Sequence, residues 1–321
     1  MNILRCKPTC FDVLEEDKHG NKHMNPNDRP NKGRAIADWE RLSRVDRMLG
    51  ISDYFIEPEP GFVDMTFTAN CGFTFKRADG VKNIILSNFR PERRQKEQDY
   101  FERYFRTVLG YSTIRISDMF YFEGAGDAIP FDNAILLGHG FRTSRNMIDQ
   151  LGDLTGKMII PLELKKPDEG DKILYHLDTT MIVIDNPSER IIFAYRGAFT
   201  DASWALLKYE VEKRAGHLLE ATYDDAANLA LNAIIVNKSD ISLDEKQTYG
   251  DEILTRHYEY ICNALRNENK DFKGVIITAN TASNRLLQDV YAWGYYPITL
   301  PLGEFIKAGG GAFCLTKILC D

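Results

Sequence analysis

Side chains that could act on one substrate lie in three short motifs, far apart in the 321-residue chain. Cys314 follows the glycine run 309–311, and His176 begins a His-Leu-Asp-Thr motif. Glu123 and Asp127 are the ends of a Glu-Gly-Ala-Gly-Asp motif. A thiol, an imidazole and several carboxylates are the parts of a cysteine enzyme for a planar, cationic substrate.

A guanidinium carbon is a poor electrophile because its charge is spread over three nitrogens. An enzyme must therefore bind the cation with carboxylates and bring a thiolate over its face. His176 could protonate the departing amine and later deprotonate the water that releases the covalent intermediate. A lone cysteine is more often a small buried hydrophobic residue, so the assignment of Cys314 depends on the other motifs.

The composition is globular, with 44% hydrophobic and 27% charged residues. The net charge of -7 suits a small cationic substrate and argues against a nucleic-acid surface. Six irregularly spaced cysteines indicate a reducing compartment, and no secretory or membrane-spanning apolar run is present. We expect a soluble cytoplasmic protein that binds neither nucleic acid nor membrane; its oligomeric state is open, with a homo-oligomer among the alternatives.

The elements that must position these residues form a recurring module of strand, turn, strand, helix and strand. The first module has strands at 65–75, 81–87 and 113–117 and a helix at 91–108. The second has strands at 122–129, 134–137 and 158–164 and a helix at 144–151. The third has strands at 180–184 and 190–195 and a helix at 204–215.

The fourth module has strands at 229–236 and 275–278 and a helix at 251–267. The last has a helix at 281–293 and a strand at 297–300, with Cys314 at the start of a final strand. No module is large enough to bury its own faces, so we expect all of them to close around one axis. The predicted fold is a five-bladed α/β propeller in a single catalytic domain, 1–321; two ordinary α/β domains are the alternative.

These motifs resemble the guanidino-group modifying enzymes, the pentein superfamily, over nearly the whole chain. The similarity is greatest to the arginine dihydrolase-like, amidinotransferase-annotated branch, which is related to dimethylarginine dimethylaminohydrolases and arginine deiminases. The motifs that carry it are CKPTCFDV (6–13), VDMTFTAN (63–70), SNFRPER (87–93), FEGAGDA (122–128), GFRT (140–143), HLDT (176–179) and GGGAFCLT (309–316).

The resemblance implies that Cys314 is the nucleophile and His176 the acid and base. Glu123 would position His176 or the guanidino nitrogens, and Asp178 would hold the guanidino group. It further implies that two arginines grip the α-carboxylate of an amino-acid substrate and that three more polar residues complete the inner wall; these are Arg90, Arg142, Asp64, Asn70 and Asp127. No metal or cofactor is implied.

Simpler interpretations exist for some of these residues. Asp127 could cap a turn beside Gly126, Arg90 could be a solvated residue at a helix start, and Asp64 could cap a strand. A lid is predicted over 11–29, with Asn25 in it. His19 and His23 have metal-ligand spacing only on a helix, which Gly20 and Asn21 argue against.

Asn70 departs from the deiminases it resembles, which commonly carry aspartate at that position. A carboxylate can only accept hydrogen bonds from a guanidinium, whereas a carboxamide both donates and accepts. Asn70 could therefore also hold the oxygen of a neutral ureido group. Arginine dihydrolase-like relatives carry this asparagine, which leads to the hypothesis that the site acts on arginine or citrulline and yields ornithine and ammonia.

The favoured function is thus a metal-independent cysteine hydrolase of carbon–nitrogen bonds in a free arginine-type amino acid. An amidinotransferase would use the same covalent intermediate but pass the amidino group to an amine. A non-catalytic pentein that only binds a ligand is the third alternative. Ammonia release without an acceptor amine distinguishes the first from the second.

Overall fold

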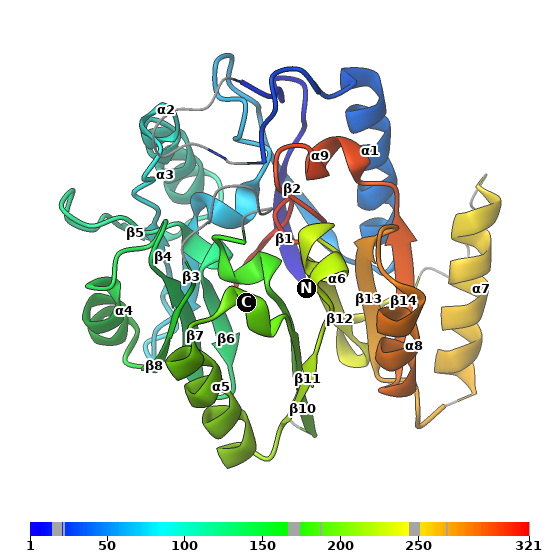
Figure 1. Cartoon of the computed structure of the whole chain (residues 1–321). Coiled ribbons are helices and arrows are strands. Elements are labelled where there is room, and N and C mark those ends of the chain that lie inside the picture. Colours follow the sequence, from blue (N-terminus) through cyan, green and yellow to red (C-terminus); the bar gives the residue numbers. More distant parts are fainter. Residues whose placement is uncertain are drawn as a thin grey trace.

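The computed structural model describes residues 1–14, 21, 23–165, 174–186, 188–243, 251–267 and 269–320. Their strands form five three-stranded sheets that surround a common centre, with most helices on the outside (Figure 1). In every sheet the middle strand pairs antiparallel with one neighbour and parallel with the other. This arrangement confirms the predicted propeller of five strand-strand-helix-strand modules.

Each module has at least one helix between its two parallel strands, as a crossover requires. The first is β3 (Gly72–Lys76), β4 (Lys82–Leu86), α2 (Glu92–Gln95), α3 (Glu97–Thr107) and β5 (Ser112–Ile114). The second is β6 (Ala128–Phe131), β7 (Ala134–His139), α4 (Met147–Thr155) and β8 (Met158–Glu163). The third is β9 (Met181–Asn186), β10 (Glu189–Ala194), α5 (Asp201–Lys213) and β11 (His217–Glu220).

The fourth module differs from the prediction in the place of one helix. It comprises β12 (Ile234–Asn237), β13 (Gly274–Ala279), α8 (Asn284–Ala292) and β14 (Tyr295–Leu300), preceded by the short α6 (Tyr223–Ala227). The helix predicted at 251–267 is α7 (Glu252–Arg266), which lies between the antiparallel strands β12 and β13. The true crossover is α8, so the helix and strand assigned to a last module belong to the fourth.

The fifth module is built from both ends of the chain, and the prediction of its composition was wrong. Its sheet has the order β15 (Lys317–Ile318), β1 (Asn2–Cys6) and β2 (Ser52–Ile56), with α1 (Lys32–Met48) as the crossover. β15 pairs with β1 through Ile3↔Ile318 and Leu4↔Lys317. Cys314 precedes this final strand by three residues rather than beginning it, and α9 (Gly303–Ile306) lies just upstream.

The strands predicted at 65–75 and 122–129 begin too early because each prediction includes a short turn. These are the 3-10 turns η1 (Thr68–Cys71) and η2 (Gly124–Gly126). The equivalent turn of the third module, η3 (Leu177–Thr179), ends just before the strand predicted at 180–184. Around η1, apolar residues alternate with threonines, a pattern that wrongly indicates a strand with one exposed face. Thr66 and Thr68 are in fact buried like their apolar neighbours. Their hydroxyls donate to the carbonyl oxygens of Cys6 and Leu4, both at 3.0 Å.

Four of the helices begin where a side chain accepts hydrogen bonds from the first backbone N–H groups. The caps of α1, α5 and α8 are Asn31, Thr200 and Ser283, each accepting from the third residue after it. Asp251 caps α7 in the same way, by accepting from Ile253 and Leu254. These local signals agree with the predicted positions of α5, α7 and α8 to within a few residues, whereas α1 was not predicted.

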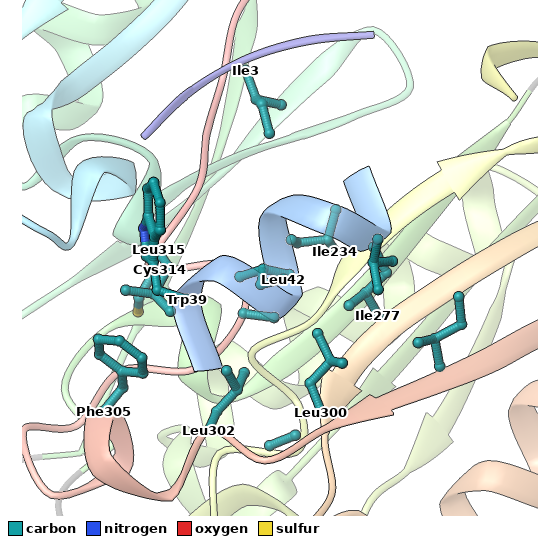
Figure 2. Close-up of a cluster of buried hydrophobic side chains, with 14 of the residues drawn as sticks. Ile3, Trp39, Leu42, Ile234, Ile277, Leu300, Leu302, Phe305, Cys314 and Leu315 are labelled. Carbon is teal, nitrogen blue, oxygen red and sulfur yellow. The ribbon is translucent and has the colours of Figure 1, made fainter. Parts of the chain in front are cut away.

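The hydrophobic core that carries the Cys314 segment joins the fourth and fifth modules. Figure 2 shows side chains of this cluster, among them Cys314, Trp39 and Leu42 from α1, Ile277 from β13 and Leu300 from β14. The nucleophile predicted from sequence is therefore attached to a packed core, where its backbone has little freedom.

No described helix is both long and apolar enough to cross a membrane.

Gly124 lies where the first two modules touch, and there is no room for a side chain at its position. Its φ is +59°, and a Cβ there would lie 2.6 Å from the backbone nitrogen of Gly72. We expect Gly124→Ala to lower the free energy of unfolding by about 3 kcal/mol, from left-handed strain plus overpacking. Denaturant unfolding measures this change.

Gly80→Ala is the matched control, because Gly80 has φ +83° but open space where its Cβ would be. We expect it to cost only the backbone term, about 1 kcal/mol. Equal losses for the two variants would show that the contact with Gly72 does not matter.

Candidate active site

Three of the predicted site residues lie in or directly after the turn that precedes the first strand of a module, whereas Arg90 and Arg142 follow the middle strands β4 and β7. Asn70 is in η1, Asp127 follows η2, and Asp178 is in η3. The fourth and fifth modules have turns at the same place, which include Asn232, two residues before β12, and Cys314, three residues before β15. Five repeated turns thus bring polar residues distant in sequence to one end of the propeller.

Cys314 and His176 line the same small cavity, of about 20 Å³. Asp64, Asn70 and Arg142 also line it, as predicted from the sequence. The other lining residues were not predicted as site residues: Asn21, Phe67, Pro91, Arg93, Arg94, Tyr175, Ala308 and Gly309. The imidazole and the thiol therefore face a shared, nearly closed space.

The Cys314 sulfur lies between an acceptor and a donor. It is 3.2 Å from Oδ2 of Asp178 and 3.1 Å from Nδ2 of Asn232. Burial and the adjacent Asp178 carboxylate raise the pKa of the thiol well above its ordinary value. Burial also raises the pKa of Asp178 to about 7. Without a cation nearby, the thiol is protonated and donates to Asp178.

Glu123 is bonded to His176, which agrees with the first of its two predicted roles, that of positioning His176. Nε2 of His176 is 2.7 Å from Oε2 of Glu123, and Nη1 of Arg142 is 3.1 Å from both carboxylate oxygens. Burial disfavours the charge of Glu123, but the guanidinium of Arg142 and the bond from His176 outweigh it. The pKa of Glu123 is consequently held well below its usual range.

The two arginines expected to grip a carboxylate have different surroundings. Arg142 lines the cavity but is paired with Glu123. Arg90 is not among the described residues that line the cavity. Its Nη1 donates to the carbonyl oxygens of Gly140 and Phe141. Arg93, three residues later, does line it.

Asp64 and Asn70 lie on the cavity wall in different states. Nε and Nη2 of Arg93 are 3.2 and 2.9 Å from Oδ2 of Asp64. The other carboxylate oxygen of Asp64 is buried and has no hydrogen-bond partner among the described residues. Nδ2 of Asn70 is 3.4 Å from the carbonyl oxygen of Glu123. Asp64 therefore has one carboxylate oxygen that can accept a hydrogen bond from a ligand.

Asp127 lies behind the wall rather than on it. Its carboxylate accepts from the Thr143 hydroxyl at 2.6 Å and from the Leu177 backbone at 3.1 Å. Burial raises its pKa to about 7. These contacts join the second and third modules, so the simpler interpretation of Asp127 as a turn-holding residue describes its geometry better than a place on the inner wall.

The predicted lid is described only in part, because residues 15–20 and 22 lie outside the described residues, as does His19. Asn21 lines the cavity and donates to the carbonyl oxygen of Ala308. Asn25 is exposed and accepts from the backbone of Asn27. Among the described residues of this segment, Asn21 lines the cavity and Asn25 does not.

A larger cavity, of about 300 Å³, lies on the other side of the turns. Its wall is mostly apolar and comes from the first strands of the five sheets, through residues such as Phe73, Ile129, Val183, Ile235 and Ile318. Asp178 lines this cavity and not the small one. The carboxylate that contacts the thiol thus separates the two spaces.

Comparison with known proteins gives this geometry a family. A family model described as N,N dimethylarginine dimethylhydrolase, eukaryotic, matches residues 7–248. The chain is 29% identical, over 98% of its length, to the bifunctional arginine dihydrolase/ornithine cyclodeaminase AgrE of Nostoc sp., but it spans only 37% of that protein. It is 27% identical to the N(G),N(G)-dimethylarginine dimethylaminohydrolase of Mycobacterium tuberculosis, covering 88% of this chain and 74% of the relative.

A solved structure is similar over almost the whole chain. It is the N-terminal domain of ArgZ, an arginine dihydrolase from the ornithine-ammonia cycle in cyanobacteria, bound to substrate. The TM-score is 0.75 at 25% identity, covering 98% of this chain and 96% of that one. The resemblance to the pentein superfamily and the predicted five-module propeller are thereby confirmed.

The ion pair of Glu123 with Arg142 makes a pH-dependent contribution to stability that can be measured. Because the folded pKa of Glu123 lies below its usual 4.5, this contribution is present above about pH 4.5 and is lost as the pH falls toward the folded pKa. At pH 7, we expect Glu123→Gln to lower the free energy of unfolding by about 3–5 kcal/mol, since Arg142 is left buried without a charge partner.

Below pH 4.5 the loss of stability with acid should be shallower in Glu123→Gln than in the wild type. Denaturant unfolding between pH 7 and pH 3 compares the two slopes. Glu92→Gln, a change at an exposed glutamate, is the control and should follow the wild type. Parallel curves for the wild type and Glu123→Gln would contradict the assignment.

Proposed function

The chain belongs to the N,N dimethylarginine dimethylhydrolase family, and on this premise we propose that it hydrolyses carbon–nitrogen bonds in a free arginine-type amino acid. The observation that carries the proposal is the shared cavity of Cys314 and His176. We further propose that residues 1–321 act as one catalytic domain and that the protein works in the cytoplasm. No metal or cofactor enters the proposed reaction.

Substrate binding in this proposal begins with the cation. Asp64 and Asp178 each have a buried carboxylate oxygen without a hydrogen-bond partner among the described residues, and a guanidinium offers donors for both. A positive charge beside Asp178 also weakens the hold of that carboxylate on the thiol proton. The arrival of the substrate therefore favours the thiolate that must attack it.

The chemistry then follows from the positions of the thiol and the imidazole. The Cys314 sulfur forms a bond to the guanidino carbon, and the carbon–nitrogen bond breaks as protonated His176 gives its proton to the departing ammonia. Neutral His176 then takes a proton from water, whose hydroxide attacks the carbon and expels the sulfur. Glu123 fixes the orientation of the ring throughout.

The α-carboxylate of the substrate needs a cation on the opposite wall. Of the two arginines proposed for this task, Arg142 lines the cavity, whereas Arg90 is not among the lining residues and its side chain bonds to the carbonyl oxygens of Gly140 and Phe141. Arg93 is the additional candidate because it lines the cavity and is already fixed by Asp64. A bidentate guanidinium suits a carboxylate in either case.

The similar proteins favour water over an amine as the second reactant. They are an arginine dihydrolase and a dimethylaminohydrolase, and both names describe hydrolysis. Amidino transfer to an amine, through the same covalent intermediate, is the alternative.

Asn70 leads to a prediction about how far the reaction proceeds. If its amide also holds the ureido oxygen, arginine and two waters yield ornithine, carbon dioxide and two molecules of ammonia. We expect Asn70→Asp to stop at citrulline with one ammonia, since a carboxylate cannot donate to that oxygen. Amino-acid analysis with an ammonia assay, without any acceptor amine, measures both outcomes.

Cys314→Ser is the inactive control, and citrulline, methylated arginines and agmatine are tested as alternative substrates. Citrulline that accumulates in the wild type and is never consumed would refute the ornithine product. Ammonia release that requires an added amine would identify a transferase instead. Activity that survives in Cys314→Ala would refute the cysteine mechanism.

A further inference from the structure

We propose that Asn232 is a further catalytic residue, whose side-chain amide donates a hydrogen bond to the Cys314 sulfur and stabilises its thiolate. The role in turnover rests on the function proposed above. The bond itself is a property of the free protein and can be tested without substrate.

Asn232 is fully buried, and every polar atom of its side chain is used. Its Nδ2 is 3.1 Å from the Cys314 sulfur and 3.1 Å from the carbonyl oxygen of Asp178. Its Oδ1 accepts from the backbone N–H of Cys314 at 2.9 Å and of Gly311 at 3.0 Å. Both sides of the amide are thus satisfied by the nucleophile and its neighbours.

This network fixes the orientation of the amide. Two backbone N–H groups can only donate, so the atom that faces them must be the carboxamide oxygen. The NH₂ group must then face the sulfur and the Asp178 carbonyl, which both accept. A reversed amide would place donor against donor on one side and acceptor against acceptor on the other.

The two side chains that contact the sulfur have opposite effects on it. Asp178 can accept from the thiol but repels a thiolate, whereas Asn232 donates and so favours the negative sulfur. Within the described residues, Asn232 is the side chain whose hydrogen bond to the sulfur is retained when the sulfur loses its proton. If a bound cation neutralised the charge of Asp178, the hydrogen bond from Asn232 would be the remaining influence of these two side chains on the sulfur, and it favours the thiolate.

Asn232 also fixes where the sulfur lies. Besides the two bonds to its side chain, its carbonyl oxygen accepts from the backbone of Phe313 at 3.3 Å. The approach to the preceding turn is so close that a Cβ on Gly311 would lie 2.9 Å from Oδ1 of Asn232. The last residue of the fourth turn therefore holds the whole fifth turn in register.

The test measures the thiol directly in the full-length protein. Iodoacetamide alkylation of Cys314 is followed from pH 6 to 11 by mass spectrometry of its peptide, in the wild type and in Asn232→Asp. The aspartate keeps the acceptor for the backbone but places a carboxylate oxygen beside the sulfur. Because a charge-assisted hydrogen bond is lost, we expect Cys314 alkylation below its pKa to fall by about 10- to 100-fold.

Two controls separate this effect from general damage. Cys10, which is partly exposed, is the internal control and should be alkylated at the wild-type rate in every variant. Asn237→Asp makes the same change at the other end of β12, where the side chain accepts from the Tyr295 hydroxyl, and should leave the Cys314 profile unchanged. Under the same proposal, kcat for arginine falls in Asn232→Asp.

If Asn232→Asp does not fold, Asn232→Ser takes its place, because its shorter side chain withdraws the donor from the sulfur without adding a charge. The same direction is expected, with about a tenfold effect. An unchanged Cys314 alkylation profile in either folded variant overturns the proposal. A shifted profile in a protein that never consumes arginine supports the role of Asn232 and refutes the proposed function alone.

Discussion

The closure of the ring by the pairing of β15 with β1 is the constraint on which the site depends. Only two residue pairs, Ile3 with Ile318 and Leu4 with Lys317, form this ladder. Further bonds support it, since Nζ of Lys317 donates to the carbonyl oxygen of Gly72 at 2.8 Å and the backbone of Ala69 donates to that of Cys314 at 3.1 Å. The position of the thiol depends on this pairing, because residues 317–318, just downstream of Cys314, complete the fifth sheet and Lys317 bonds to the first module.

Charge balance is the second organising feature of the site. Three buried carboxylates at the site differ in their partners: Glu123 contacts Arg142 and His176, Asp64 contacts Arg93, and Asp178 contacts the thiol. Glu123 and Asp64 are each paired with an arginine, whereas the thiol beside Asp178 is a neutral donor. Of these three carboxylates, Asp178 is therefore the one without an ion pair, and it lies next to the Cys314 sulfur. The site can accept a cation there without breaking an ion pair.

Much of this was accessible from the sequence, for reasons that individual residues illustrate. Cys314, His176 and Glu123 occur in motifs where glycine and polar residues interrupt apolar strands, and the regular spacing of those motifs predicted the module. Asn232 was missed because it stands alone within Leu-Asn-Ala, with no motif around it; its place before the first strand of the fourth module was the available signal. The fifth sheet was missed because β15 has only two residues and its partner is at the other end of the chain.

The choice between Arg90 and Arg93 could not be made from the sequence, since both occur in one Arg-Pro-Glu-Arg segment. Which guanidinium faces the cavity depends on how the backbone turns at Pro91 and on the reach of Asp64, and these are tertiary facts. The misplacement of strand starts has a similar origin. Buried threonines that bond to a neighbouring module look, in sequence, like the polar face of a strand.

The pairing of β15 with β1 also bears on the order of folding. The strands of the other four sheets all lie between Gly72 and Leu300, whereas the fifth sheet joins strands that precede and follow this whole stretch. A contact of such long sequence separation forms late and slowly. We therefore expect the Cys314 thiol to reach its place beside Asp178 and Asn232 only after the other four sheets have formed.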